Sequence, residues 1–379
     1  MPRKKLQIIT SYPFNSEPVI SNRLIPFITA ANNYNYHIQI VSSDNEVYKV
    51  DGAPFEHILV PDLCRKPKNL AKRMWFEIRQ ARRLIKAAAA FEADYRMITV
   101  PSMFLLFQMY LFKKSIVIVD LRDITWDYVS ARNPISAAIK KLFEIFAHNN
   151  LKSALFVNVT NITERNYLLD NFRLKNVELL IVPNGVTQYQ YHQLSDVTVN
   201  TSTPLKIAYI GNVGLGQNLR YLVDVAINLP HVHFYIVGSG TDYTALKKYV
   251  EKAKISNLTM TGRLCWGEVK KIYISTHILY AQLSPDFSMA MPSKLYEYLS
   301  TGKFVIYGGQ HQAKKTLANF DNNIVIEPCN SKSLEDAILH LLESKAYLKL
   351  SSKNQRKIED NFIREKTVSK FFEYLNMHH

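Results

Sequence analysis

The segment MPSKLYEY, residues 291–298, places a cation and a carboxylate three positions apart, Lys294 and Glu297. Pro292 and Ser293 are typical of the first turn of a helix, and positions i and i+3 of a helix share one face. The lysine, the glutamate and the N–H groups of the helix start would then point to one place, which suits a ligand with both a phosphate and a sugar diol. Spacing alone favours a simpler interpretation, an intrahelical ion pair.

A glycine-rich turn, GNVGLG at residues 211–216, follows the apolar run LKIAYI and precedes a helical pattern. Glycines at a strand-to-helix turn let backbone N–H groups approach a phosphate, and a helix N-terminus favours negative charge. The spacing is not GxGxxG, so the dinucleotide fingerprint is not met. A phosphate site and a simple tight turn both remain open here.

A third cluster, DLRDITWD at residues 120–127, follows directly on the apolar run SIVIV. Its three carboxylates and one arginine would stand at the carboxyl edge of a parallel strand, where open α/β sheets bind ligands. Clustered carboxylates can supply a general base or hold a metal. The alternative is an Arg–Asp pair that caps the start of a helix.

Residues 65–86 carry nine Lys and Arg and a single acid, Glu77. The spacing predicts an amphipathic helix, with the apolar residues Leu70, Met74, Ile78, Ala81, Ile85 and Ala88 in one narrow sector. The opposite sector holds the cations Lys72, Arg79, Arg82, Arg83 and Lys86. Such a helix can lie on anionic lipid with these five cations as its contacts, or it can be a packed helix with a solvated face.

Short apolar runs rich in Ile, Val and Tyr alternate with helical patterns along nearly the whole chain. Such runs are typical of strands buried on both faces of a parallel sheet, and their alternation with helices indicates βαβ units. Six runs precede Pro183-Asn184-Gly185: LQIIT, HIQIVS, RMITV, SIVIVD, LFVNV and LLIVP. Six follow it: LKIAYI, HFYIVG, LTMTG, HILYAQL, FVIYGG and NIVIEP.

We therefore expect an α/β protein of two Rossmann-like, doubly wound parallel-sheet domains that face a cleft. The first domain spans residues 1–186 and the second spans residues 205–352. The composition of the polar, Ser/Thr-rich segment 187–204 predicts a linker between them. Residues 353–379 are expected to form a helix that crosses back to the first domain.

The chain has 379 residues, of which 47% are apolar and 21% charged, a composition that excludes a disordered or fibrous protein. Its net charge of +15 favours polyanionic partners such as nucleic acid, phosphorylated ligands or anionic lipid. Cys64, Cys265 and Cys329 lack disulfide or metal spacing, which indicates a reducing compartment. The first apolar run is too short for a signal peptide, and the most apolar stretch, 103–112, is about half of a bilayer span. We expect a cytoplasmic protein.

Five short motifs, in order, resemble those of the family 4 glycosyltransferases with the GT-B fold. They are IVPNGV at 181–186, YIGNVG at 209–214, IVGSG at 236–240, TGRL at 261–264 and PSKLYEYLSTGKFVI at 292–306. In the first half, DLRDITW at 120–126 is similar to the D-x-R-D-x-W motif of the bacterial surface-polysaccharide branch. The resemblance covers nearly the whole chain.

The resemblance implies a UDP- or GDP-linked sugar donor bound mainly by the second domain and an acceptor bound mainly by the first. Glu297 matches the second Glu of the E-x7-E motif, which binds the donor ribose, and Gly262-Arg263 matches the nucleobase loop. The expected donor-site residues are Gly211, Asn212, Gly214, Gln217, Gly238, Arg263, Ser293, Lys294 and Glu297. The expected catalytic residues are Arg122, Asp123 and Lys294.

The sequence also departs from the family pattern. The first Glu of E-x7-E falls at Met289, and the usual Arg and Lys near the diphosphate fall at Asn212 and Gln217, which leaves Lys294 as the best remaining cation. The glycine pair of the first loop is replaced by FNSEPV, residues 14–19, and the usual histidine of the first domain by the Arg122-Asp123 region.

The resemblance implies a hexosyl- or N-acetylhexosaminyltransferase that acts on a lipid-linked glycan in bacterial surface polysaccharide synthesis, at the inner face of the plasma membrane. It favours retention of anomeric configuration, while Asp123 leaves inversion open as a base facing the acceptor hydroxyl. No DxD motif stands at a strand end of the second domain, so we expect no essential metal and no cofactor. Two alternatives remain. One is a GT-B nucleotide-sugar epimerase. The other is a nucleic-acid-binding protein, against which stands the observation that only Trp75 and Phe76 interleave with the basic residues 65–86.

Overall fold

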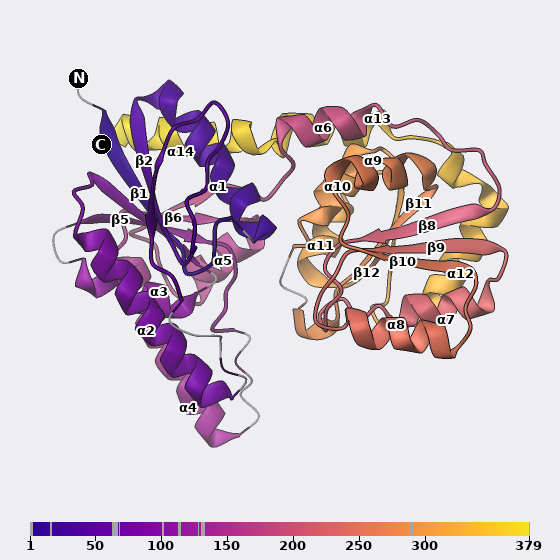
Figure 1. Ribbon diagram of the computed structural model, residues 1–379, viewed down its shortest axis with the longest axis horizontal. Coiled ribbons are helices and arrows are strands. Elements are labelled where there is room, and N and C mark those ends of the chain that lie inside the picture. The colour runs from indigo at the N-terminus through magenta and orange to yellow at the C-terminus, as the bar shows by residue number, and fades with distance from the viewer. Residues whose placement is uncertain are drawn as a thin grey trace. The chain divides into compact units, whose positions relative to one another are not determined.

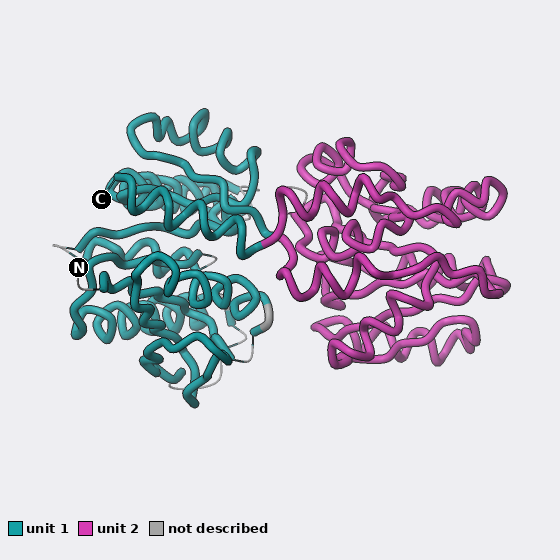
Figure 2. Tube along the Cα trace, turned by 90° about the horizontal axis from the view of Figure 1, so that it is seen from above, with its two compact units in different colours: residues 1–184, 364–379 teal, residues 185–363 magenta. Residues whose placement is uncertain are grey.

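The computed structural model describes residues 3–15, 17–62, 67, 69–100, 102–112, 115–127, 129, 133–287 and 291–378. The chain forms two compact units, shown in different colours in Figure 2. Unit 1 comprises residues 1–184 and 364–379, and unit 2 comprises residues 185–363. The chain therefore leaves unit 1 once and returns to it with its last helix.

Unit 1 is built on a seven-stranded parallel sheet in the order β3-β2-β1-β4-β5-β6-β7 (Figure 1). The strands are β1 Lys4–Ile9, β2 Tyr36–Ser42, β3 Glu56–Leu59, β4 Tyr95–Val100, β5 Ile116–Leu121, β6 Phe156–Val159 and β7 Glu178–Ile181. The helices are α1 Pro18–Ala31, η1 Asn32–Tyr34, α2 Leu70–Ala89, α3 Met103–Phe107, η2 Met109–Leu111, α4 Pro134–Lys152, α5 Ile162–Asp170 and α14 Arg364–His378.

Unit 2 is built on a six-stranded parallel sheet in the order β10-β9-β8-β11-β12-β13. The strands are β8 Leu205–Ile210, β9 Val232–Val237, β10 Leu258–Gly262, β11 Ile278–Gln282, β12 Phe304–Gly308 and β13 Asn323–Ile326. The helices are α6 Gln188–Ser195, α7 Arg220–Asn228, α8 Tyr243–Lys252, α9 Trp266–Ser275, η3 Pro285–Phe287, α10 Lys294–Ser300, α11 His311–Leu317, α12 Ser331–Ser344, η4 Ala346–Leu348 and α13 Ser352–Asn361.

The predicted pair of parallel α/β sheets is confirmed, and each of the twelve apolar runs contains a strand. The central strands are buried on both faces, as in β5 and β12, which is why they show little polar alternation. The sequence prediction missed β3, the edge strand EHIL, because Glu56 and His57 are polar and the strand lacks a continuous apolar run.

Two segments differ from their expected form. The segment 187–204 contains the helix α6, whose start is fixed by a capping box between Thr187 and Gln190. The segment 353–379 forms two helices, α13 and α14, which belong to different units.

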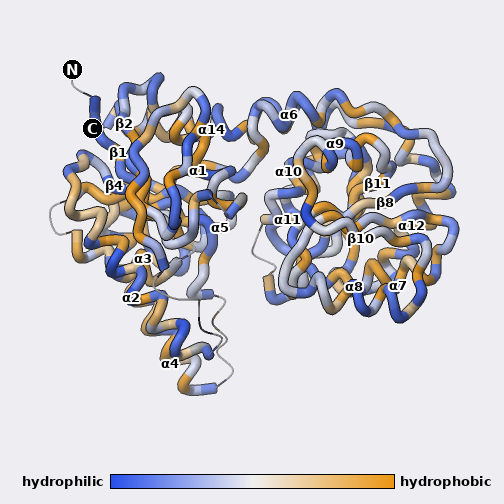
Figure 3. The backbone as a smooth tube through the Cα atoms, viewed as in Figure 1, coloured by the Kyte–Doolittle hydropathy of each residue, from blue (hydrophilic) through white to orange (hydrophobic). Residues whose placement is uncertain are grey.

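The last helix completes the core of unit 1, since α14 packs along α1. Phe371 and Phe372 are fully buried, and their rings lie edge-on to Phe27 of α1 at centroid distances of 5.1 and 6.3 Å. Figure 3 shows apolar segments along the strands of both sheets. The two sheets thus supply stable platforms whose carboxyl edges carry the loops of interest.

Candidate substrate site

In unit 2 the loops after β8 and β9 pack backbone against backbone. The Gly211 N–H donates to the carbonyl of Val237 at 2.9 Å, and the Val213 N–H donates to that of Ser239 at 3.0 Å. Gly238 has φ of +137°, and a Cβ there would lie 1.8 Å from the Gly211 oxygen. Gly238 is therefore needed for this tight turn, and two of the loop's amides are already used within the protein.

The same turn brings Asn212 and Gln217 together, because the Asn212 Nδ2 donates to Gln217 Oε1 at 3.1 Å. A Cβ on Gly214 would lie 2.7 Å from the Asn212 Nδ2, so Gly214 makes room for this amide pair. The two positions where the resemblance expected an arginine and a lysine thus form a neutral, hydrogen-bonded pair. This edge of the loop carries amide dipoles and no cationic side chain.

The third loop at this edge follows β10. The carbonyl of Gly262, which has φ of +74°, accepts the Gly238 N–H at 2.8 Å, so the second and third loops are joined. Arg263 is exposed beside this junction. The structure thereby links three of the predicted positions, Gly211, Gly238 and Gly262, through one continuous backbone contact.

The predicted cation–carboxylate pair lies on α10, which begins at Lys294 with Ser293 as its N-cap. The Lys294 Nζ lies 2.9 Å from both carboxylate oxygens of Glu297, and the Tyr273 hydroxyl donates to Glu297 Oε2 at 3.0 Å. Glu297 is 5% exposed, whereas the Lys294 side chain is 37% exposed. The ion pair that the spacing favoured is therefore present, with the lysine reaching solvent.

Glu297 still has capacity for a ligand. A carboxylate offers about four lone-pair directions, and the three hydrogen bonds from Lys294 and Tyr273 occupy three of them. Burial raises the pKa of the Tyr273 hydroxyl well above its usual value, with the charge of Glu297 adding to the effect, so this hydroxyl stays protonated and donates. A sugar hydroxyl could bond to the remaining direction on Oε1.

Tyr298 couples α10 to the end of β8. Its buried hydroxyl accepts the Ile210 N–H at 2.7 Å and lies 3.1 Å from the Ile210 carbonyl, immediately before Gly211. The helix that carries Lys294 and Glu297 is thus fixed to the strand that leads into the glycine turn. Met289, the position of the family's first glutamate, lies outside the described residues.

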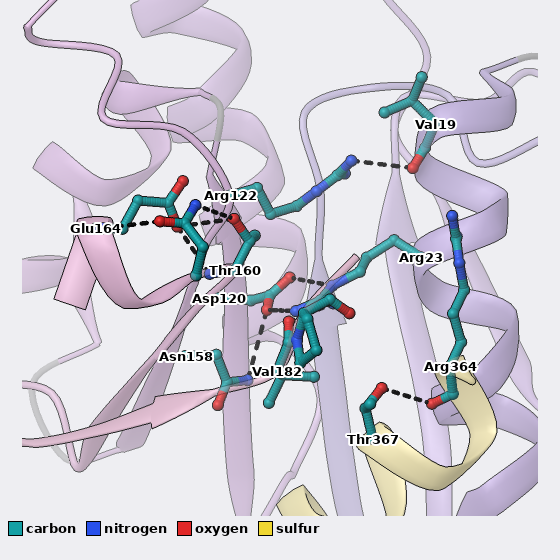
Figure 4. Close-up of polar contacts among 12 residues, drawn as sticks. Val19, Arg23, Asp120, Arg122, Asn158, Thr160, Glu164, Val182, Arg364 and Thr367 are labelled. Carbon is teal, nitrogen blue, oxygen red and sulfur yellow. Dashed lines mark hydrogen bonds and ion pairs between the residues drawn. The ribbon is translucent and has the colours of Figure 1, made fainter. Parts of the chain in front are cut away.

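In unit 1, Asp120 and Arg122 of the cluster at the end of β5 have different partners, Arg23 and Val19 (Figure 4). Asp120 is fully buried and forms a bidentate pair with Arg23 of α1, at 2.6 Å from Nη2 and 3.2 Å from Nε. The Arg23 Nη1 also donates to the carbonyl of Val182 at 2.9 Å. Trp126 is fully buried as well, so both residues hold the fold together and neither can touch a substrate.

Arg122 is 8% exposed, and its Nη2 donates to the carbonyl of Val19 in the first turn of α1 at 3.1 Å. Its Nε and Nη1 have no hydrogen-bond partner in the described structure, and burial lowers its pKa, with nearby Arg23 adding to the effect. Asp123, which follows it, is partly exposed at the carboxyl edge of the sheet. The predicted pair is therefore present at this edge, with donor capacity left on the guanidinium.

Glu164 was not predicted and lies close enough to Asp123 to interact electrostatically. Its Oε2 accepts the Thr160 N–H at 2.7 Å and the Thr160 hydroxyl at 2.8 Å, and it is 4% exposed. Burial raises its pKa to about 8, with the charge of Asp123 contributing and the Thr160 bonds opposing. The sequence signal was the pattern TNITE at 160–164, in which Asn161 caps α5.

The basic segment forms α2 as predicted, but the helix faces differ from the expected ones. Ala81, Ile85 and Ala88 are buried, whereas Ile78 is 41% exposed. Lys72, Arg79, Arg82 and Lys86 are exposed. Arg83 is an exception, because its Nη1 donates at 2.7 Å to the Pro61 carbonyl and to Gln80 Oε1. Arg83 therefore ties α2 to the loop after β3 and is not a free membrane contact.

The described residues offer neither a cluster suited to a metal ion nor a helix suited to cross a membrane. Within the described ranges, no three His, Cys, Asp or Glu side chains gather in a way that could hold a metal ion. None of the described helices combines the length and apolar character needed to cross a bilayer.

One protein family matches most of unit 2. Residues 191–359 match the family described as glycosyl transferases group 1. All the predicted donor-site residues lie within this range. No curated protein sequence matches the chain.

Solved structures of the same fold cover almost the whole chain. Sucrose-phosphate synthase from Thermosynechococcus elongatus has 14% identity and a TM-score of 0.76 over 99% of both chains. A glycosyltransferase from Rickettsia africae has 13% identity and a TM-score of 0.71, over 99% of this chain and 98% of that one. HepE from Anabaena, in complex with UDP and glucose, has 12% identity and a TM-score of 0.68, over 99% and 100%. The chain thus has the GT-B fold.

Proposed function

We propose that the protein is a glycosyltransferase that moves a sugar from a nucleotide-sugar donor to a glycan acceptor. The observation that carries this proposal is the match of residues 191–359 to the group 1 glycosyl transferases, on a sheet whose carboxyl-edge loops hold the expected donor residues. The Anabaena structure contains UDP and glucose at 12% identity, which supports a UDP-linked donor as the first one to test.

Lys294 is the proposed stabiliser of the leaving group. Cleavage of the sugar–phosphate bond leaves negative charge on a nucleoside diphosphate, and a fixed cation lowers the barrier by stabilising that charge as it develops. The partly exposed ammonium is held by Glu297 at 2.9 Å, so it is already positioned before the donor binds. Glu297 would accept a ribose hydroxyl on its remaining lone pair, and Ser293 precedes both at the helix start.

The acceptor is assigned to unit 1, near Arg122 and Asp123. The Arg122 guanidinium has two buried donor atoms without a partner in the described part of the protein, and the Asp123 carboxylate beside it is partly exposed. We propose retention of anomeric configuration, as the resemblance implies, and transfer without an essential metal because the donor domain has no DxD motif. An inverted product would instead assign Asp123 as the base for the acceptor hydroxyl.

The proposed acceptor is a lipid-linked glycan in bacterial surface polysaccharide synthesis, reached at the inner face of the plasma membrane. The exposed cations of α2, Lys72, Arg79, Arg82 and Lys86, favour an anionic surface by about 1 kcal/mol each near the headgroups. Changing Arg79, Arg82 and Lys86 to Gln should weaken binding to anionic vesicles and use of a lipid-linked acceptor while donor binding is kept. If this variant binds the vesicles as well as the wild type does, α2 is a solvated surface helix without a membrane contact.

A donor screen tests the central proposal. UDP- and GDP-linked hexoses and N-acetylhexosamines would be added with EDTA, and the shift in melting temperature and the release of nucleoside diphosphate would be measured. Lys294→Ala should slow turnover by up to about a thousandfold, by analogy with loss of an oxyanion-hole donor. Lys332→Ala, which removes another ion-paired helical lysine of unit 2, is the matched control and should change nothing.

The screen can also contradict the proposal. A protein that neither binds nor cleaves any donor, or whose Lys294→Ala variant turns over normally while folded, would remove the donor-site assignment. NMR of the product anomer would settle the stereochemistry independently.

A further inference from the structure

The outer side of α4 carries five large apolar side chains in solvent. They are Ile135, Ile139, Leu142, Ile145 and Phe146, with exposures of 74, 40, 49, 49 and 45%. Because they recur every three or four residues, they form one stripe along the helix. The inner side of α4 is already packed, with Ala147 and Leu151 fully buried in the core of unit 1. The stripe is therefore a second apolar face that the fold itself does not need.

This concentration is confined to α4. Across the described ranges, every other helix or strand has at most two exposed large apolar residues. Single exposed apolar side chains are normal on soluble proteins, but a contiguous group marks an interaction surface.

The charges beside the stripe indicate what covers it. At 100° per residue, Lys141 and Lys152 border the stripe on one side, and both are exposed. Glu144, the sole acid of α4, falls on the far side of the helix from Ile135. An apolar stripe bordered by cations and free of acids is the pattern of a helix that lies in the plane of an anionic lipid surface.

The helix α2 also carries an exposed aromatic residue beside a cation. It is connected to α4 through the short helix α3, which contacts both, with the Phe107 ring 5.7 Å from that of Phe146. On α2, Trp75 is 63% exposed, and the Arg79 guanidinium lies 5.4 Å from its ring centroid. Tryptophan beside a cation is typical of residues at the headgroup level of a membrane. Figure 3 shows apolar and polar segments alternating along α2 and α4.

We propose that α4 lies in the surface of an anionic bilayer, with its apolar stripe inserted below the headgroups and Lys141 and Lys152 at the phosphates. The inference rests on the proposed function in one respect: a lipid-linked acceptor would explain why the enzyme binds a membrane. It assigns the contact to apolar insertion by α4, whereas the contact proposed for α2 is electrostatic. Vesicle binding by the whole protein should then persist in part at high salt, where the lysine and arginine contribution is screened.

The test compares two double variants of the full chain. Ile139→Gln with Leu142→Gln makes the centre of the stripe polar, and Ile227→Gln with Leu339→Gln does the same to side chains of unit 2 with similar exposures of 47 and 40%. Flotation with vesicles of phosphatidylcholine plus phosphatidylglycerol should show binding by the wild type and by the unit 2 variant. Binding by the α4 variant should be weaker by at least about tenfold. Melting temperatures and circular dichroism check that both variants are folded.

Three results would overturn the inference: no binding of the wild type to these vesicles, binding unaffected by the α4 substitutions, or a wild-type dimer that the α4 substitutions dissociate. The last result would assign the stripe to a second copy of the chain. The response of the melting temperature to the UDP- and GDP-linked sugars of the donor screen is measured in parallel. If none of these donors shifts the melting temperature of any of the proteins while the vesicle pattern holds, the proposed function fails and the membrane contact of α4 stands.

Discussion

Glu164 offers a quantitative test of the environment near Asp123. Its pKa is raised from 4.5 to about 8, so between these pH values the native state binds a proton that the unfolded state has released. Stability gained from the neutral carboxyl is therefore fully present below pH 4.5 and is lost as the pH rises to about 8. Glutamine is uncharged in both states, so Glu164→Gln should remove this pH dependence.

The size of the effect follows from the pKa displacement. At pH 7 the gap of about 2.5 pKa units to the unfolded value of 4.5 corresponds to about 3 kcal/mol. Gln Oε1 can still accept from the Thr160 N–H and hydroxyl, so the two bonds of the carboxylate are kept. For a unit of this size, about 3 kcal/mol raises the melting temperature by roughly 6–12 °C at pH 7, with little gain near pH 4.5.

Thermal unfolding measured from pH 5 to 8.5 checks this expectation, with Glu92→Gln, an exposed glutamate of unit 1, as the control. The wild-type and Glu164→Gln curves should diverge as the pH rises, while the control follows the wild type. Parallel curves, or a Glu164→Gln protein that is less stable at pH 7, would show that the Thr160 bonds outweigh burial and that the carboxyl is ionised in the native state.

Four further substitutions test the two edges. Glu297→Gln should weaken donor binding more than turnover, measured by calorimetry with UDP and by initial rates. Asp123→Asn should lower turnover at least a hundredfold if it acts as a base, with donor affinity kept. Tyr298→Phe should cost about 1–3 kcal/mol by leaving a buried backbone N–H of β8 without its acceptor, seen as a lower melting temperature. Asp120→Asn should cost about 3–5 kcal/mol because Arg23 keeps its charge without a carboxylate, and a stable variant would contradict its structural role.

Local patterns predicted the elements well. Apolar runs predicted twelve strands, among them central strands such as β5 that are buried on both faces, whereas β3, with the sequence EHIL, gave no such run. The i, i+3 spacing of Lys294 and Glu297 predicted an ion pair because that contact depends only on the geometry of one helix.

Contacts between distant residues were not predictable in the same way. Asp120 looked like a ligand of the sheet edge, but its partner Arg23 stands 97 positions earlier and draws the carboxylate into the core. Arg83 belongs by its spacing to the cationic sector of α2, yet its hydrogen bond to the Pro61 carbonyl holds it against the loop after β3, partly buried. In both cases the side chain's role is set by a partner that only the folded chain brings near.

The return of α14 to unit 1 has a consequence for how the protein is made. Unit 2 is one continuous segment, so it can fold as soon as it has left the ribosome, although it is synthesised second. Unit 1 is synthesised first, but it must wait for the last residues to cover α1 with Phe371 and Phe372. During translation of about 180 residues, the apolar side of α1 around Phe27 stays open and is a natural binding site for chaperones that follow the nascent chain.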